Sequence, residues 1–252
     1  MIPLRDHNRP DSFPYLTYGL IAANVLVFFY QARGPEGEEE KLVREMGLKP
    51  AFVVAYLRGE RSIEYLERSI EHNPSGQMRL VQRQRSSRLD FWNSLFPFLA
   101  SMFLHGGIGH LLSNVWFLHI FGDNVEDRLG HFRYLFFYVG TGLTASITQV
   151  VVSPDSAIPC VGASGAISGV LGGYAFLFPH ARVLTLVPVF IFLQFMEIPA
   201  FIFLFIWFGL QVLQGFLSDP GMGGVAWWAH IGGFVAGMVL VKLFPQRPPT
   251  KI

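Results

Sequence analysis

The sequence contains, from Ile198 to Leu217, the stretch IPAFIFLFIWFGLQVLQGFL. This stretch carries no charged side chain, and a helix that crosses the hydrocarbon core of a bilayer needs about 20 mostly apolar residues. Other long uncharged stretches lie on both sides of it, and hydrophobic residues make up 51% of the 252-residue chain. The sequence therefore predicts a membrane protein.

Charged residues are scarce and unevenly distributed. They make up 15% of the chain, against about 25% in a typical soluble domain. Nine of the 37 lie between Phe91 and Val241. This distribution excludes a soluble enzyme, a disordered chain and a nucleic-acid binder, and the net charge of +1 implies no polyanionic partner. The single cysteine, Cys160, excludes a disulfide framework and a thiolate metal cluster.

We expect an all-α membrane protein with six spanning helices and a large outer first loop. The expected spans are Pro14–Tyr30, Pro97–Phe121, Tyr134–Val152, Ser164–Phe178, Ile198–Leu217 and Val225–Leu243. The apolar stretch Val183–Phe195 is too short to span and contains Pro188, so we expect an interfacial or re-entrant segment there. No small-residue cleavage site follows the first stretch, which is therefore taken as a span rather than a signal peptide.

Lys and Arg in short loops predict the orientation of the spans. The second loop (Gly122–Arg133), the fourth loop and both tails carry basic residues, whereas the third (Ser153–Ala163) and fifth (Ser218–Gly224) carry none. We therefore expect both termini on the cytoplasmic side, in a bacterial inner membrane. The expected division of the chain is a tail 1–13, a first span 14–31, an outer loop 32–94, a core 95–244 and a tail 245–252.

The outer loop 32–94 is the only sizeable aqueous part. Apolar residues around Phe52–Leu57 and Ile63–Ile70 are mixed with charged ones, which is typical of amphipathic helices lying on a membrane surface. A small soluble packing unit explains the same pattern equally well.

Polar side chains inside spans are costly in lipid and mark candidate functional residues. The second span carries His110, Ser113 and Asn114, the fourth begins with Ser164, and the sixth carries His230. With the expected orientation, these three helices all enter from the outer face. Their polar groups should therefore share one layer just beneath the outer surface.

Small residues predict that the helices bearing these groups touch. Gly233 and Gly237 in the sixth span form a small-xxx-small pair, which allows two backbones to approach closely in lipid. Gly233 lies three residues after His230, so the same helix face should bring the imidazole toward the fourth span. The glycines assigned to this packing are Gly162, Gly165, Gly169, Gly233 and Gly237.

A serine within reach of a histidine is the minimal activated nucleophile. Ser164 would attack while His230 takes its proton and returns it to the leaving amine. Backbone N–H groups at Ser164 are free at the start of their helix, and His110 and Asn114 share one helical face. These groups could stabilise an oxyanion. No carboxylate is placed to complete a triad, so we expect a dyad.

These residues resemble the rhomboid intramembrane serine proteases over about Met102–Leu240. The matching pieces are Phe103-Leu104-His105-Gly106-Gly107, His110-Leu111-Leu112-Ser113-Asn114, Gly122-Asp123-Asn124-Val125-Glu126-Asp127-Arg128-Leu129-Gly130, Gly162-Ala163-Ser164-Gly165 and Ala229-His230-Ile231-Gly232-Gly233. Each piece is weak alone, but five in order are specific. The resemblance implies a six-helix fold, Ser164 as nucleophile, His230 as general base, and an oxyanion hole of His110, Asn114 and the Ser164 backbone.

The sequence departs from the family pattern at two positions. Ala226 stands where many members have glycine, and Ser168 stands where some have an aromatic residue that stacks on the histidine. How His230 is held is therefore open. The family also suggests lateral substrate entry between the second and fifth helices, with the loop containing Gly221-Met222-Gly223-Gly224 lifting to admit substrate.

Simpler roles compete for several of these residues. Ser164 alone would more often be a packing serine, and His110 with Asn114 could be a structural pair. His105 is expected to hydrogen-bond a loop. Glu126 and Arg128 are expected to orient the second loop. Ser168 is either a packing residue or a water contact, and His119 is expected to be structural.

The leading hypothesis is an intramembrane serine endopeptidase that hydrolyses peptide bonds in or next to transmembrane segments. The alternatives are a rhomboid-like pseudoprotease that binds membrane-protein clients without cleaving them, and a channel with a polar path. The expected partners are transmembrane substrates and the lipid bilayer. We expect no nucleic acid, cofactor or metal, since no zinc-type spacing such as HExxH is present.

Overall fold

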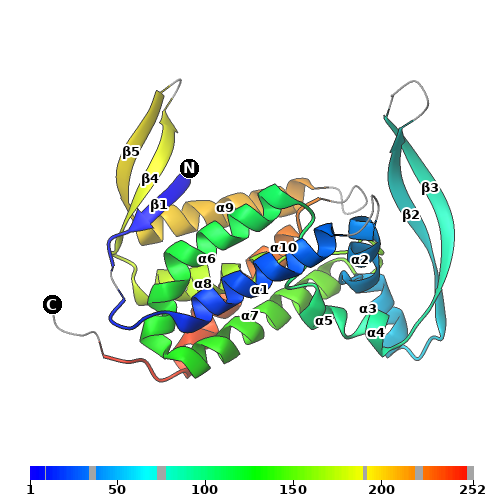
Figure 1. Cartoon of the computed structure of the whole chain (residues 1–252), viewed down its shortest axis with the longest axis horizontal. Helices are drawn as coiled ribbons and strands as arrows, with labels where there is room; N and C mark the ends of the chain where they lie inside the picture. Colours follow the sequence, from blue (N-terminus) through cyan, green and yellow to red (C-terminus); the bar gives the residue numbers. More distant parts are fainter. Residues whose placement is uncertain (9, 34–37, 73–77, 190–191, 219–223, 249–252) are drawn as a thin grey trace.

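The computed structural model describes residues 1–8, 10–33, 38–72, 78–189, 192–218 and 224–248. Six apolar helices form a bundle (Figure 1). They are α1 (Tyr15–Ala32), α6 (Ile108–Leu129), α7 (His131–Val152), α8 (Ser164–Leu177), α9 (Ala200–Leu217) and α10 (Trp227–Leu240). The short helices α2 (Glu38–Met46), α3 (Pro50–Leu57), α4 (Phe91–Ser94) and α5 (Pro97–Ala100) lie at one end of the bundle, and the 3₁₀ helix η1 (Val241–Leu243) follows α10.

Among the described residues, three helices are long and apolar enough to cross a membrane: α1, α7 and α9. A fourth candidate joins Phe91–Phe103 to α6 across a 70° bend, whereas α8 and α10 are apolar but shorter. The expected second span, Pro97–Phe121, was therefore wrong at both ends, because the chain bends after α5 and α6 continues to Leu129. Apolar side chains such as Leu26, Phe136 and Phe216 are exposed on the outside of the bundle, as contact with lipid requires.

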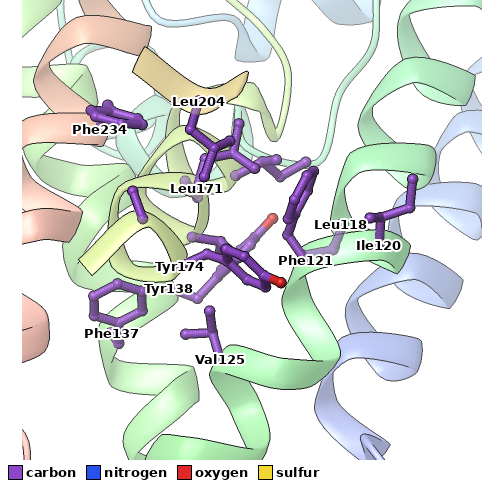
Figure 2. Packing of buried hydrophobic residues seen from close by; sticks show 14 of the residues in the cluster. Leu118, Ile120, Phe121, Val125, Phe137, Tyr138, Leu171, Tyr174, Leu204 and Phe234 are labelled. Carbon is purple, nitrogen blue, oxygen red and sulfur yellow. The ribbon is translucent and has the colours of Figure 1, made fainter. Parts of the chain in front are cut away.

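Helix α8 lies at the centre of the bundle. All its residues from Ala166 to Ala175 are buried. Figure 2 shows Leu171 and Tyr174 of α8 packed among residues of α6 and α7, including Phe121 and Tyr138. The rings of Phe121 and Tyr174 meet edge to face at 5.0 Å. This core fixes the position of the helix that begins at Ser164.

Glycines let α8 and α10 touch along their backbones. A Cβ on Gly233 would overlap the carbonyl oxygen of Gly165, and one on Gly237 would overlap that of Gly169. Gly172 of α8 is similarly close to the carbonyl oxygen of Phe234. This is the close approach that the small-residue pattern predicts.

The expectation of an all-α protein was wrong at the segment Val183–Phe195. It forms a hairpin of β4 (Arg182–Val189) and β5 (Phe192–Pro199), which joins β1 (Ile2–Asp6) in an antiparallel sheet of order β1-β4-β5. Val183 and Thr185 are buried while their neighbours are less so. This period of two is typical of a strand.

The expected amphipathic helix at Ile63–Ile70 is also a strand. It lies in β2 (Ser62–His72), which pairs with β3 (Met78–Arg88) in an antiparallel hairpin. Ile63 and Tyr65, two residues apart, both pack against α3, where the rings of Tyr65 and Phe52 are 5.1 Å apart. The segments around Phe52 are helical as expected. The described part of segment 32–94 therefore includes a small unit in which β2 packs against α3.

The expected second loop, Gly122–Arg133, is almost entirely helical. Helix α6 ends at Leu129 and α7 begins at His131, so the turn is confined to Gly130, whose φ of +76° favours glycine. Glu126 is fully buried and accepts hydrogen bonds from the backbone N–H groups of Leu16 (2.9 Å) and Thr17 (2.7 Å) at the start of α1.

Arg128 lies at the same end of α6 and contacts the C-terminal segment. Its Nη2 donates to Oε1 of Gln246 at 3.3 Å, and its carbonyl accepts from the backbone N–H of Arg247 at 2.7 Å. Glu126 also contacts Nδ1 of His131 across the Gly130 turn, so it orients the second loop as expected, whereas Arg128 connects α6 to the C-terminal segment.

Candidate active site

Ser164 is the first residue of α8, and Gly162 and Ala163 lead the chain into this helix. Gly162 has φ of +124°, a conformation that side chains rarely adopt, and its N–H donates to the carbonyl of Ser101 at 2.8 Å. The N–H groups of the first helical turn have no acceptor within the helix. Ser164 itself is partly exposed, whereas the residues from Ala166 to Ala175 below it are buried. The hydroxyl therefore stands at the rim of the core.

His230 lies in the first turn of α10 and is buried. Its Nε2 is 2.7 Å from Oγ of Ser164. The contact exists because Gly233, one turn further along α10, sits against the carbonyl of Gly165 and leaves no room for a side chain between the two helices. The sequence thus brings these two groups together through glycine packing.

The other ring nitrogen of His230 contacts Gln211 of α9. Nδ1 lies 2.8 Å from Oε1 of Gln211, whose Nε2 donates to the carbonyl of Trp207 at 3.2 Å. The Trp207 ring lies 6.1 Å from the imidazole at an interplanar angle of 30°, and Trp227 meets it edge-on at 6.1 Å. Two indoles and an amide therefore surround the histidine, in place of the aromatic residue missing at position 168.

His110 lies next to the serine. A Cβ placed on Gly162 would be 2.6 Å from Nε2 of His110 and 3.5 Å from Oγ of Ser164, so both side chains border the same point. Nδ1 of His110 accepts a 3.4 Å hydrogen bond from the N–H of Gly106. In a neutral imidazole with this contact, Nδ1 is the acceptor and Nε2 is the donor, so neutral His110 has a donor beside the serine.

Asn114 follows His110 by one helical turn and shares its face of α6. Its side chain is buried, and its Nδ2 has no hydrogen-bond partner among the described residues. A buried donor without an acceptor is unusual in a folded protein. The amide is thus available to an oxygen atom that the protein itself does not supply.

A small cavity of about 30 Å³ adjoins the serine. Its lining includes Ser164, Gly165, Gln149 and Ala229. Gln149 lies on α7 and accepts a hydrogen bond from the N–H of Ala229 at 3.3 Å. The volume is about that of a single water molecule, and the mixed polar lining suits one.

Two other residues singled out in the sequence, Ser168 and His105, lie outside this arrangement. Ser168 is buried and its hydroxyl donates to the carbonyl of Ser164 at 2.6 Å, a packing role. His105 exchanges two backbone hydrogen bonds with the Gln31 side chain, which ties α1 to the segment before α6, as expected of a loop contact. The expected lifting loop lies mostly outside the described residues, since of Gly221-Met222-Gly223-Gly224 the structure describes Gly224 alone.

Sequence reasoning missed Gln211, Gln149 and Trp207. The signal for Gln211 was present, because a glutamine inside an apolar span is as notable as a histidine. It was overlooked because α9 runs opposite to α6, α8 and α10, so only its second half reaches the layer of the serine. Gln211 is six residues from the end of α9, while His230 is three from the start of α10.

Comparison with known proteins identifies relatives over most of the bundle. The family model described as Rhomboid domain matches residues 91–247. Rhomboid-like protein 11, chloroplastic, of Arabidopsis thaliana is 28% identical over 167 residues, which cover 62% of this chain and 55% of that protein. Rhomboid protein 1, mitochondrial, of Saccharomyces cerevisiae is 30% identical over 113 residues (43% and 33%). Putative rhomboid protease YdcA of Bacillus subtilis is 38% identical over 88 residues (35% and 42%).

The match therefore spans between a third and about half of the length of these relatives. Two of the three are named for chloroplasts and mitochondria. The comparisons thus do not support the expected restriction to a bacterial inner membrane.

Proposed function

Because this chain belongs to the rhomboid family, we propose that it is an intramembrane serine endopeptidase that cleaves membrane proteins in or next to their transmembrane segments. The observation that carries the proposal is the 2.7 Å contact between Oγ of Ser164 and Nε2 of His230. Some relatives are named as proteases, which agrees with this chemistry. A pseudoprotease would have no need of this contact.

The reaction follows from the two groups. Ser164 Oγ attacks the carbonyl carbon of the scissile bond while Nε2 of His230 takes the hydroxyl proton. The tetrahedral intermediate collapses, the C–N bond breaks, and the histidine returns the proton to the leaving amine. Water then attacks the acyl-enzyme with the histidine again as base, which releases the second product and restores Ser164.

The negative charge on the intermediate needs donors at the carbonyl oxygen. We assign this role to Nε2–H of His110, Nδ2–H of Asn114 and the backbone N–H of Ser164. The unpartnered amide of Asn114 and the position of His110 beside Gly162 support the assignment. Each donor is fixed by a helix before the substrate arrives.

The six apolar helices would all lie in the bilayer, with Ser164 beneath the outer surface. Helix α8 has 14 residues, a length of about 21 Å, against a hydrocarbon thickness of about 30 Å. An end of α8 must therefore lie inside the bilayer. The basic residues near both tails place those on the cytoplasmic side, so Ser164 would lie in a depression that opens outward.

The test is cleavage of a reporter protein with one transmembrane segment, by the purified chain in liposomes. We expect cleavage by the wild type and loss of at least about 10³-fold in rate for Ser164→Ala and for His230→Ala. A fluorophosphonate should label the wild type at Ser164, and Ser164→Ala should remain unlabelled. Binding of the reporter without cleavage or labelling would favour the pseudoprotease instead.

A further inference from the structure

Gln211 makes the one side-chain hydrogen bond to the catalytic histidine besides that of Ser164, among the described residues. Its amide is buried between α9 and α10. Oε1 faces Nδ1 of His230 at 2.8 Å, and Nε2 donates to the carbonyl of Trp207 at 3.2 Å. The amide therefore has a different kind of partner at each end.

These two partners fix the orientation of the amide. The carbonyl of Trp207 can only accept a hydrogen bond, so the NH₂ group must face it and the amide oxygen must face His230. An amide oxygen can only accept, so Nδ1 of His230 must carry the proton. Nε2 then carries the lone pair, and it faces Oγ of Ser164. This is the tautomer that can accept the serine proton.

We propose that Gln211 is a positioning residue that selects the reactive tautomer of His230, the task that a carboxylate performs in a catalytic triad. The inference rests on the proposed function, because the tautomer matters for a general base. A neutral amide does this without burying a charge, which is costly within a bilayer. The Trp207 ring also restrains the imidazole of His230 from one side. Trp207 and Gln211, one turn apart on α9, would therefore set both the ring plane and the tautomer of His230.

The placement on α9 has a further consequence. Ser164 and His230 lie on α8 and α10, which are locked together through glycines, whereas Gln211 lies on a different helix. A shift of α9 away from α10 would leave the dyad distance intact and remove the acceptor from Nδ1. Catalytic competence would then depend on the position of α9.

The direct test reads the tautomer by ¹⁵N NMR of the full chain with labelled histidine, in detergent micelles. The signals of His230 are assigned by their loss in His230→Ala. We expect the wild type to carry the proton on Nδ1. Gln211→Leu should shift His230 toward the Nε2-protonated form, whereas Gln211→Glu, which keeps an acceptor oxygen, should retain the Nδ1-protonated form. Retention of the Nδ1-protonated form in Gln211→Leu would overturn the proposal.

Kinetics supply the second readout. Gln211→Leu should lower kcat about 10- to 100-fold, the effect of removing the partner that orients a functional histidine, with KM nearly unchanged. Gln211→Glu should restore most of the rate. The matched control is Gln214→Leu, one turn further on the exposed face of α9, which should leave both kcat and tautomer unchanged. An equal loss of kcat in Gln211→Glu and Gln211→Leu would indicate a packing role and overturn the proposal.

The two proposals can fail separately. The NMR measurement needs no catalysis, so a wild type that cleaves nothing but changes tautomer on Gln211→Leu would refute the protease function and keep the role of Gln211. A wild type that cleaves, with kcat and tautomer unchanged in Gln211→Leu, would refute the role of Gln211 alone.

Discussion

Buried Asn114 and half-buried Asp6 are two polar residues whose replacement tests the proposed function and the stability of this chain. The buried side chain of Asn114 has an amide donor with no partner among the described residues. Asp6 lies in β1, at the opposite end of the bundle, and its carboxylate accepts from the hydroxyl of Tyr174 and from Nδ2 of Asn124 at 2.9 Å. A buried donor without a partner and a carboxyl partly removed from water both cost free energy. Replacing Asn114 should therefore change activity, and replacing Asp6 should change the pH dependence of stability.

Asn114→Ala should lower kcat for a transmembrane reporter about 10²- to 10³-fold, the effect of losing one oxyanion donor. KM should change little, because the hydrogen bond forms with the intermediate rather than with the bound substrate. The neighbouring Ser113, whose exposed hydroxyl donates to its own helix backbone at 2.8 Å, provides the control variant Ser113→Ala. A loss of melting temperature that accounts for the lost activity would instead indicate a structural Asn114.

Asp6 should make the stability of the chain depend on pH. Burial raises the pKa of its carboxyl to about 6, an effect that the hydrogen bond from Tyr174 partly offsets. Between pH 4 and 6 the folded state then binds more protons than the unfolded state. The contribution of Asp6 to the free energy of unfolding should therefore fall as pH rises through this interval, by at most about 3 kcal/mol, and level off above it.

The measurement for Asp6 is the melting temperature in detergent from pH 4 to 7. His7 of β1, Asp123 of α6 and Tyr174 of α8 face this carboxyl, so the difference between Asp6→Asn and wild type isolates its contribution. Asp6→Asn should flatten the decline, whereas Asp155→Asn, at an exposed position at the other end, should not. Parallel curves for wild type and Asp6→Asn would contradict this assignment.

At the scale of elements, the central contact is the one between α8 and α10. Apolar side chains add little attraction between helices in lipid, so close backbone packing has to hold them together. Gly237 fits against the carbonyl of Gly169 with no room for a methyl group. Gly209 of α9, by contrast, faces open space.

These two glycines give opposite predictions for the same substitution. Gly237→Ala should lower the free energy of unfolding by about 1–3 kcal/mol through overpacking, measured in detergent. Because the helices separate next to the dyad, fluorophosphonate labelling of Ser164 should slow as well. Gly209→Ala should be neutral or stabilise the chain by up to about 1 kcal/mol, since alanine favours a helix. An equal change in the free energy of unfolding for Gly237→Ala and Gly209→Ala would refute close packing as the cause of the destabilisation.

The sequence predicts the elements that depend on a single segment better than those that need a distant partner. Long apolar stretches and small-residue pairs predict the helices and the α8–α10 contact, because both depend on the composition of one segment. The hairpin β4–β5 was missed because its inner strand, β4, also pairs with β1, which lies at the other end of the chain. Gln211 is a polar residue inside an apolar span, but its contact with His230 was missed because it depends on α9 running opposite to α10.

At the scale of the whole molecule, the outer unit formed by α2, α3 and the β2–β3 hairpin is attached to the bundle next to the candidate active site. Leu48, between α2 and α3, exchanges two backbone hydrogen bonds with Cys160, at 2.9 and 2.8 Å. Cys160 lies four residues before Ser164. The outer unit is therefore hydrogen-bonded to the segment that leads to Ser164, and we expect it to hold that segment in position.

Gly47 makes this attachment testable. A Cβ at this position would lie 2.6 Å from Cβ of Pro159, so Gly47→Ala should push α2 away from the segment before Ser164. Burial raises the pKa of the Cys160 thiol to about 11, so alkylation by iodoacetamide at pH 8 should be slow in the wild type. In Gly47→Ala the exposed thiol should react at least about 10-fold faster, as thiolate formation becomes easier in water.

Fluorophosphonate labelling of Ser164 should fall in the same Gly47→Ala variant, because the segment between Cys160 and the serine loses its support. Gly19→Ala, on α1 with open space around it, should change neither rate. Faster alkylation of Cys160 with unchanged labelling of Ser164 would mean that the serine is held by α8 alone. The outer unit would then be attached next to the site without supporting it.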